Sequence, residues 1–436
     1  MPPAGQSLPI TGRAPDLRRD SPALALFLLT AISTIGFVDR IIMNVLVEPL
    51  RKEFALTDTQ IGLLVGLAFA VLNVVLGIAV ARIAERRPRL PLIAVGTLLW
   101  SIATAGCGMV GSWMQLLVAR IGVGVGEAVG LPATASVISD YFPPKRRATA
   151  MSVLALAPPV GALIGSAGGA WIAQHYGWRA AFQFAALPGL LLALAVWALV
   201  AEPPRGRHDS GDSGEVPSLG TVLARFWHIP SARHLLAGSS IAGMVGFGLN
   251  AFLAAMLARR FGFTLVEAGV TAGLVASFPA TISVLAGGWL ADRIGARNPS
   301  AYALIPGLCL LVSAPLYLLA ITRDVPWQLL SLLGLSALVQ YTYLGCTSGV
   351  FQNLMAPRMR ATATAFTSMV YTLIGGGLGP LLLGVLSGYF GPLHPGPGES
   401  LVWAMGATAL LYFWAALHYL LAARHVGNDL RAARAA

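Results

Sequence analysis

Four charged residues lie inside apolar stretches of the first half of the chain. Asp39 and Arg40 are neighbours in the first stretch, and Arg120 and Glu127 lie seven residues apart in the fourth. A charge within hydrocarbon costs about 2.5–3.5 kcal/mol on insertion scales, so each of these residues is expected to have a partner and a function. A separation of seven residues is about two helical turns, so Arg120 and Glu127 share one helix face. Depth along the two helices then predicts the pairs Asp39–Arg120 and Arg40–Glu127.

The charges of these four residues, which we call the charged quartet, sum to zero and leave two interpretations open. In the first, the quartet is a purely structural network. In the second, which we prefer, Asp39 and Glu127 exchange protons while Arg40 and Arg120 bind an anionic group of a substrate. A buried carboxylate beside an arginine can load and release a proton as access to it alternates.

The apolar stretches of the second half carry polar but uncharged residues. Their hydroxyl and amide groups can bind the neutral part of a substrate, or they can hydrogen-bond one helix to another. Each residue alone is explained by helix packing, whereas the cluster indicates a binding surface. The candidates for substrate binding are Asn250, Gln340, Tyr341 and Thr347.

These residues require membrane helices to position them. Hydrophobic residues make up 56% of the chain and charged residues 11%, against roughly 45–50% and 25% in soluble domains. A helix needs about 20 apolar residues to cross about 30 Å of hydrocarbon. The sequence predicts an all-α membrane protein with twelve transmembrane helices, at roughly 22–46, 60–81, 90–110, 113–138, 148–174, 179–200, 234–257, 266–290, 300–321, 326–351, 361–388 and 400–421.

The second half of the chain repeats the first at a fixed offset of 207 residues. The matching pairs are Phe54 and Phe261, Thr57 and Thr264, Gly62 and Gly269, and Gly66 and Gly273. Repeated halves are how many solute carriers build a binding site between two pseudo-symmetric bundles. We therefore expect an N-terminal tail over 1–21, a six-helix bundle over 22–201, a linker over 202–233, a second six-helix bundle over 234–421 and a C-terminal tail over 422–436.

The net charge of +11 reflects membrane topology rather than a nucleic-acid partner. Of 29 Lys and Arg residues, 21 lie in the N-terminal tail, in the even-to-odd loops and in the C-terminal tail. The positive-inside rule then puts both termini and the linker in the cytoplasm, which in a bacterium means a protein of the inner membrane. All three cysteines fall within predicted spans, so no disulfide framework is expected.

Nothing in the sequence indicates a cofactor, a metal site or enzyme chemistry. A metal-ligand cluster, a phosphate-binding Gly-x-x-x-x-Gly-Lys loop and a nucleophile triad are all missing from the 436 residues. The loops are also too short to hold a soluble catalytic domain. We expect a multi-pass membrane protein that works as a monomer among membrane lipids, without a cofactor.

The loop after the eighth span resembles a signature of the major facilitator superfamily. It reads Gly288-Trp-Leu-Ala-Asp292-Arg293-Ile-Gly295-Ala-Arg297, and the first half has a degenerate copy around Glu85. The resemblance implies the major facilitator fold, with its twelve helices in two pseudo-symmetric six-helix bundles. It also implies that the acid of each copy caps a neighbouring helix and, with the arginines, locks the cytoplasmic side. The residues implied in this gating are Glu85, Arg86, Arg89, Asp292, Arg293 and Arg297.

Within that superfamily, residues 38–205 resemble the spinster group. The stretches that carry this resemblance are Val38-Asp-Arg40, Leu56-Thr-Asp-Thr-Gln-Ile-Gly-Leu-Leu64, Ala119-Arg-Ile-Gly-Val-Gly-Val-Gly-Glu-Ala128, Asp140-Tyr-Phe-Pro-Pro144, Gly177-Trp-Arg179 and Glu202-Pro-Pro-Arg205. Spinster-like proteins are implicated in moving lysophospholipids and sphingosine-1-phosphate, with proton coupling proposed for several. The resemblance thus implies that Asp39 and Glu127 are proton sites and that Arg40 and Arg120 hold a phosphate or carboxylate headgroup. One departure is Asn73-Val-Val-Leu-Gly77-Ile-Ala79, where the tyrosine and proline of the group are absent.

Together these observations predict a secondary active transporter that moves an amphiphilic, anionic, lipid-like substrate by alternating access and is coupled to protons. One alternative is an exporter of drugs or small hydrophilic metabolites. Another, from a different class, is a non-transporting membrane receptor or an intramembrane enzyme.

Overall fold

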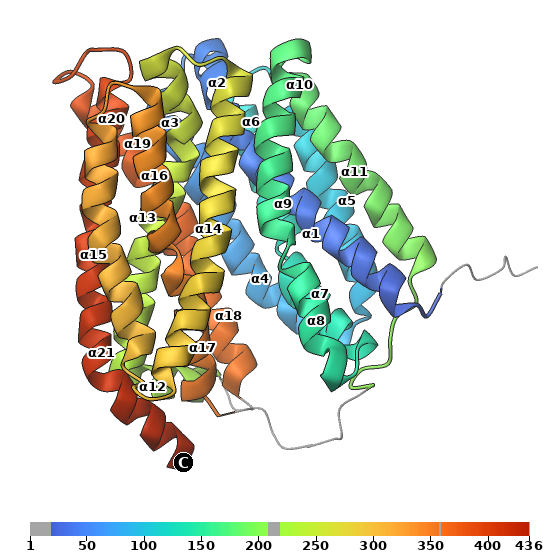
Figure 1. Ribbon diagram of the computed structural model, residues 1–436. Coiled ribbons are helices and arrows are strands. Elements are labelled where there is room, and N and C mark those ends of the chain that lie inside the picture. The colour runs from blue at the N-terminus through green and yellow to red at the C-terminus, as the bar shows by residue number, and fades with distance from the viewer. Residues whose placement is uncertain (1–18, 208–218, 357–358, 436) are drawn as a thin grey trace, which may run out of the picture.

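The computed structural model describes residues 19–207, 219–356 and 359–435, and nearly all of this chain is helical (Figure 1). Residues 1–18 of the tail predicted over 1–21, and part of the predicted linker, therefore lie outside the described residues. In the described part of the chain, the one piece of extended pairing is an isolated bridge between Arg19 and Val200.

The first half is built from long rods that are interrupted by short π-helical turns, which are labelled η. Its elements are α1 (Pro22–Val45), α2 (Val47–Phe54), α3 (Asp58–Gly62), η1 (Leu63–Leu67), α4 (Ala68–Arg86), α5 (Arg89–Cys107), α6 (Trp113–Glu127), α7 (Gly130–Tyr141), α8 (Pro144–Leu154), α9 (Ala157–Leu163), η2 (Ile164–Gly168), α10 (Gly169–Tyr176) and α11 (Trp178–Leu199).

The second half follows the same plan after a short helix in the linker region. Its elements are α12 (Leu219–His228), α13 (Pro230–Phe261), α14 (Leu265–Gly295), α15 (Ala301–Ile321), α16 (Pro326–Gln340), α17 (Thr342–Leu354), α18 (Arg360–Tyr371), η4 (Thr372–Leu378), α19 (Gly379–Phe390), α20 (Glu399–Ala409) and α21 (Leu411–Ala435).

Eleven helical segments of the described chain are long and apolar enough to cross a membrane. The predicted span over 113–138 is not among them, because it is divided between α6 with 15 residues and α7 with 12. Both are shorter than the roughly 20 residues that a bilayer requires. The twelfth crossing is therefore made by two helices in sequence, and the helix breaks directly after Glu127.

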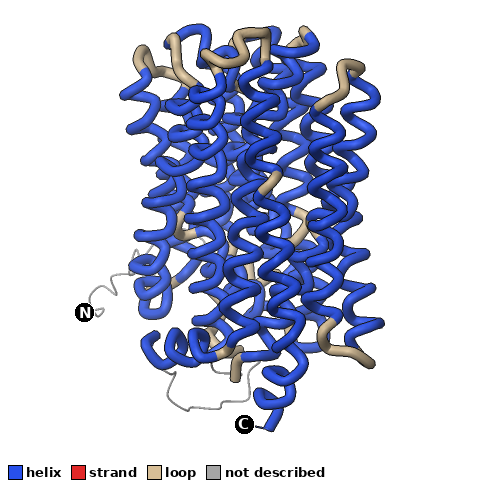
Figure 2. Tube along the Cα trace, turned by 90° about the vertical axis from the view of Figure 1, so that its left-hand side faces the viewer, coloured by secondary structure: helices blue, strands red, loops and turns tan. Residues whose placement is uncertain are grey.

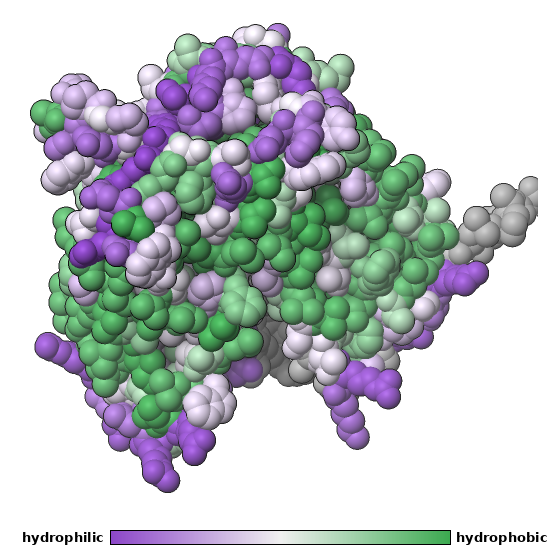
Figure 3. Space-filling view, turned by 45° about the horizontal axis from the view of Figure 1, so that its top comes forward, coloured by the Kyte–Doolittle hydropathy of each residue, from purple (hydrophilic) through white to green (hydrophobic). Residues whose placement is uncertain are grey.

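The outer surface of the bundle is apolar over its middle and polar at its ends (Figure 3). Large side chains such as Leu191, Trp197, Leu285 and Trp289 are more than half exposed there. An exposed apolar belt of this kind suits contact with lipid, since every backbone group of a membrane helix is already hydrogen-bonded within the helix. The fold is the twelve-helix fold that the sequence predicts.

The helix α1, which begins at Pro22, starts toward the same end of the bundle as that at which α21 finishes (Figure 1, Figure 2). We call this end the terminal face and the opposite end the loop face. The helix α1 starts at the terminal face, and α2 lies at the loop face, as does the short segment that joins α13 to α14 (Figure 1).

The sequence repeat corresponds to a helix start that occurs once in each half. Thr57 and Thr264 are N-caps, and each forms a capping box with the side chain three residues later, Gln60 and Glu267 respectively. In a capping box the two side chains satisfy otherwise unpaired backbone N–H groups of the first turn. The repeat therefore begins the second long helix of each half in the same register.

Candidate functional site

The charged quartet forms two ion pairs between α1 and α6, and these are the two pairs that the sequence predicts. The first pair is almost completely buried: Nη1 of Arg120 lies 3.1 Å from Oδ2 of Asp39, and both side chains are 1% exposed. The hydroxyl of Thr104 on α5 donates a second hydrogen bond to Oδ1 of Asp39, at 2.7 Å. Three neighbouring helices are thus joined at this point.

The second pair differs from the first because the side chain of one of its members, Arg40, is partly exposed. Nε of Arg40 donates to Oε2 of Glu127 at 2.6 Å. The side chain of Arg40 is 32% exposed, whereas that of Glu127 is 3% exposed. A ligand could therefore reach the guanidinium of Arg40 without displacing any helix.

An aromatic ring from the second long helix lies beside both arginines. The guanidinium carbon of Arg40 lies 4.7 Å from the ring centre of Phe69 and that of Arg120 lies 5.8 Å from it. Phe37 is a second ring beside Arg40, at 5.2 Å. Cation–π contacts of this length hold a guanidinium in place without consuming its hydrogen-bond donors. Sequence reasoning missed Phe69, because one phenylalanine in an apolar helix carries no distinguishing signal.

Two polar atoms of the quartet have no hydrogen-bond partner among the described residues. They are Oε1 of Glu127 and Nε of Arg120, both buried. Buried polar atoms are nearly always paired, so an unpaired acceptor and an unpaired donor in one site need an explanation. They leave the site with capacity to bind a proton and an anionic oxygen.

Three of the four polar candidates of the second half lie around one small cavity. Asn250, Gln340 and Tyr341 border it together with Tyr317. The amide of Asn250 donates to the hydroxyl of Tyr341 at 2.8 Å, and Gln340 accepts a hydrogen bond from Tyr412 of α21 at 2.9 Å. Tyr317 and Tyr412 escape sequence reasoning because tyrosines are common within long apolar runs.

Thr347 is not part of this group. Its hydroxyl lies 2.5 Å from that of Tyr419 on α21, and the residue is 5% exposed. The structure thus places Thr347 between α17 and α21, where it joins two helices of the second half.

The residues implied in gating lie near the terminal face, and their described contacts stay within one half. Arg89 is buried and forms ion pairs with Asp140 and with Glu202, the latter at 2.9 Å. In the second half, Asp292 accepts a hydrogen bond from Tyr302 at 2.9 Å.

The remaining gating candidates make fewer contacts. The guanidinium of Arg293 lies 5.4 Å from the ring of Trp289. Arg86 and Arg297 are exposed, and the side chain of Glu85 lies outside the described residues. In the described part of the chain, no ion pair joins these residues across the two halves.

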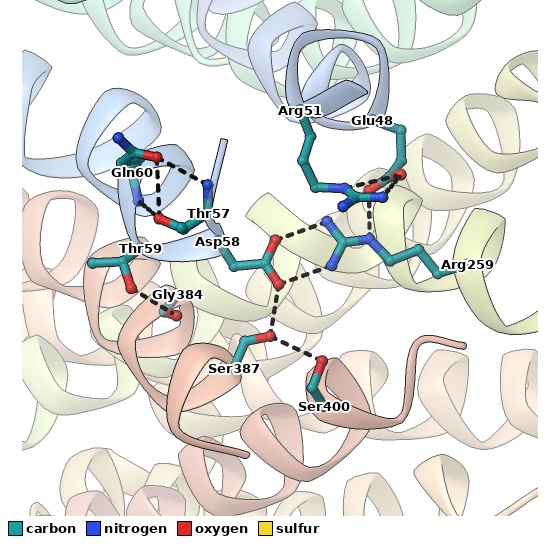
Figure 4. A network of polar contacts seen from close by, with 10 residues as sticks. All are labelled: Glu48, Arg51, Thr57, Asp58, Thr59, Gln60, Arg259, Gly384, Ser387 and Ser400. Atoms are coloured by element: carbon teal, nitrogen blue, oxygen red, sulfur yellow. Dashed lines mark hydrogen bonds and ion pairs between the residues drawn. The ribbon is translucent and has the colours of Figure 1, made fainter. Parts of the chain in front are cut away.

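At the loop face the two halves are joined by an ionic network, which we call the loop-face bridge (Figure 4). Arg259 of α13 makes a bidentate pair with Asp58 of α3, at 2.7 and 2.8 Å, and its Nε also bonds to Glu48 of α2. Ser387 of α19 donates to Asp58 at 2.7 Å. This bridge could not be predicted from the sequence, because charged residues near loops are ordinary and the partners lie about 200 residues apart.

The glycines of the repeat bring the two halves into backbone contact below the bridge. A Cβ atom added to Gly62 would lie 2.3 Å from the carbonyl oxygen of Pro380, and one added to Gly66 would lie 2.5 Å from that of Gly377. Their counterparts Gly269 and Gly273 approach η2 and α10 just as closely. Small residues permit such close packing of helices.

The halves are therefore packed together toward the loop face. The helix α3 packs against α19, and α14 packs against α9 and α10. No comparable packing joins α7 or α8 to α17 or α18 among the described residues, although these helices lie near the terminal face (Figure 1). This arrangement is sealed at the loop face.

Comparison with known proteins gives one consistent result. A profile of the Major Facilitator Superfamily matches residues 26–380. The "MFS-type efflux pump" of Mycolicibacterium smegmatis is 31% identical over 393 residues, which cover 88% of this chain and 86% of that protein. Protein spinster homolog 3 of Danio rerio is 26% identical over 409 residues, which cover 87% of this chain and 79% of that protein.

Among solved structures, a bacterial homologue of the human lysosomal transporter Spinster is similar over almost the whole chain. It is 30% identical, with a TM-score of 0.85, and the match covers 96% of this chain and 99% of that one. That structure was solved in an inward-facing and unoccupied conformation.

Proposed function

The chain belongs to the major facilitator superfamily as a spinster-like membrane transporter, and on that premise we propose that it carries an anionic, lipid-like substrate coupled to protons. The substrate would be of the lysophospholipid or sphingosine-phosphate type. Transport would proceed by alternating access between the two halves, with the terminal face in the cytoplasm. In a bacterium the protein would lie in the inner membrane and act as a monomer.

The observation that carries this proposal is the unequal exposure of the second ion pair. Arg40 is partly exposed and held by two aromatic rings, while its partner Glu127 is buried. An arginine of this kind can bind a phosphate or carboxylate through two parallel N–H donors. Arg120 would donate a further hydrogen bond to the headgroup from its unpaired Nε, on the buried side of the site.

Proton coupling follows from competition for the same guanidinium. When an anionic headgroup takes Arg40, Glu127 loses its counter-charge in a buried place, and a proton bound to Glu127 restores neutrality. Conversely, protonation of Glu127 frees Arg40 for the anion. Substrate and proton are thus bound together, with Asp39 as the second carboxylate of the relay. Buried ionisable residues in membrane helices commonly serve such relays.

The uncharged polar residues of the second half would bind the glycerol or amide part of the substrate. Asn250, Gln340 and Tyr341 provide hydroxyl and amide groups for this purpose. Thr347 would contribute indirectly, by fixing α17 against α21. In the state that is closed toward the cytoplasm, the gating residues would hold the two halves together at the terminal face. These residues are Glu85, Arg86, Arg89, Asp292, Arg293 and Arg297.

The test is uptake of a fluorescent lysophospholipid into proteoliposomes that contain the purified protein, with and without an imposed pH gradient. We expect gradient-dependent uptake that is lost in Arg40→Gln. Absence of uptake by well-folded protein, judged by size-exclusion chromatography, would reject the lipid-like substrate.

A second candidate function is export of drugs or small hydrophilic metabolites, which the similarity to the mycobacterial efflux pump favours. Thermal shifts with candidate substrates would separate the two. Stabilisation by cationic drugs or sugars, without stabilisation by lysolipids, would select the exporter.

A further inference from the structure

A larger cavity opens at the loop face, directly beside the loop-face bridge. Its volume is about 670 Å³, which lies within the usual range of roughly 300–1,000 Å³ for small-molecule sites. The lining comes from both halves of the protein: from α2, from the end of α13 with the start of α14, and from the loop that precedes α20. A ligand in this cavity would therefore contact both halves at once.

The lining combines cationic residues with apolar residues. Arg51, Lys52 and Arg259 line the cavity together with one acid, Glu48. The apolar side includes Phe263 and Leu265. An excess of cations beside an apolar wall suits a molecule that has an anionic head and a hydrocarbon chain.

The cavity reaches the bridge through Glu48. One oxygen of this carboxylate pairs with Arg259, and the other lies 3.4 Å from Arg51. The side chain of Arg51 is 37% exposed, so an incoming anion can reach it. An anion bound to Arg51 and Lys52 of the first half would lie next to Arg259 of the second half, so it would add a contact between the two halves beside Glu48.

We propose that this cavity is a second binding site for anionic single-chain amphiphiles, and that an amphiphile bound there contacts both halves and so favours the closed arrangement of the loop face. The inference rests on the proposed function for the class of ligand and for the movement between the two halves. It assigns Arg51 and Lys52 to recognition of the anion, and Glu48 to the link between the cavity and the bridge.

The experiment measures the distance between the two halves at the loop face in purified protein, without any transport. Spin labels are placed at Met109→Cys and Trp327→Cys, two exposed positions in different halves, in a background without Cys107, Cys309 and Cys346. Dodecyl phosphate is added to protein in dodecyl maltoside, a neutral amphiphile. Inorganic phosphate serves as the control, because it has the anionic group of dodecyl phosphate but no hydrocarbon chain.

We expect dodecyl phosphate to shift the distribution toward the shorter distances of the closed loop face, at a concentration at least tenfold below that needed with inorganic phosphate. The double variant Arg51→Gln, Lys52→Gln should need about tenfold more dodecyl phosphate, while Arg323→Gln removes a cation of the same face outside the cavity and should change little. Equal potency of inorganic phosphate would overturn the amphiphilic class.

Arg40→Gln separates this site from the charged quartet. If dodecyl phosphate still shifts the distance distribution in Arg40→Gln, the anion acts from the loop-face cavity. If the shift is lost in Arg40→Gln but kept in the double variant, closure of the loop face is driven from the quartet and the inference is wrong. A shift without any lipid uptake in proteoliposomes would leave the cavity site standing and reject the proposed function.

Discussion

Replacing Gly62 with alanine tests whether the glycines of the repeat keep the loop face closed. The added Cβ would lie 2.3 Å from the carbonyl oxygen of Pro380 and 2.9 Å from Cα of Leu381. Both atoms belong to the backbone of α19, so no side-chain rotation can relieve the overlap. An ordinary contact needs about 3.4 Å or more, and the two helices must therefore separate by about 1 Å.

The cost of this overlap applies only to the sealed arrangement, because the colliding atoms belong to different halves. Overpacking of this size costs about 1–3 kcal/mol. A bias of that magnitude changes the ratio of two conformations by roughly 5- to 150-fold. We therefore expect Gly62→Ala to shift the protein strongly toward states that are open at the loop face.

The assay is the same distance measurement between labels at positions 109 and 327, now without added ligand. Gly376→Ala is the matched control, since a Cβ at Gly376 would meet nothing within 4 Å although the residue lies in the same interface. Gly62→Ala should lengthen the mean distance and Gly376→Ala should not. Identical distributions in two well-folded variants would refute the reasoning.

Three further predictions concern the ionisable residues. Glu127→Gln should abolish the dependence of uptake on a pH gradient while the protein stays folded; an unchanged pH dependence would remove Glu127 from the proton path. Arg89→Gln should cost about 3 kcal/mol, because it leaves Asp140 without its buried counter-charge, and the melting temperature in detergent should fall well below that of the exposed-site control Arg86→Gln. Hydrogen bonds from Arg179 and Trp178 lower the pKa of Glu53 at the loop face. These hydrogen bonds stabilise the folded protein slightly. The stabilisation is present above the unfolded-state pKa of Glu53 and is lost as the pH falls through its folded-state pKa. The difference in melting temperature between the parent protein and Glu53→Gln should accordingly vanish in acid, and a difference independent of pH would contradict it.

The charged quartet could be predicted from the sequence for a simple physical reason. A charge in hydrocarbon must find a partner, and depth along two helices leaves few choices. The pairs Asp39–Arg120 and Arg40–Glu127 followed from that constraint and are present in the structure.

The same constraint does not act near the membrane surface, where charges are solvated. Arg259 therefore looked like an ordinary loop residue, although it joins the two halves through Asp58. The break after Glu127 also left no sign, because the apolar run continues through it. Aromatic partners such as Phe69 are hidden for a related reason, since their neighbours across the bundle are set by packing alone.

The repeat links the fold to the seal at the loop face. Thr57 and Thr264 start their helices in equivalent registers, so the glycines five and nine residues later face the opposite half in both cases. The two contacts are nevertheless unequal. Gly62 and Gly66 meet carbonyl oxygens of α19 and η4, which cannot move independently of the helix.

Gly273, by contrast, meets the hydroxyl of Ser166, and a hydroxyl can rotate. A contact through a rotatable side chain tolerates small relative movement, whereas a backbone contact is either made or broken. The contact at Gly273 can thus adjust to a small movement, whereas Gly269 meets the carbonyl oxygen of Ser166 and, like Gly62 and Gly66, makes a contact with backbone that is either kept or lost. Separation of the halves at the loop face must therefore break the backbone contacts of α3 with α19 together with the ion pair between Asp58 and Arg259, because Asp58 and Gly62 belong to the same short helix.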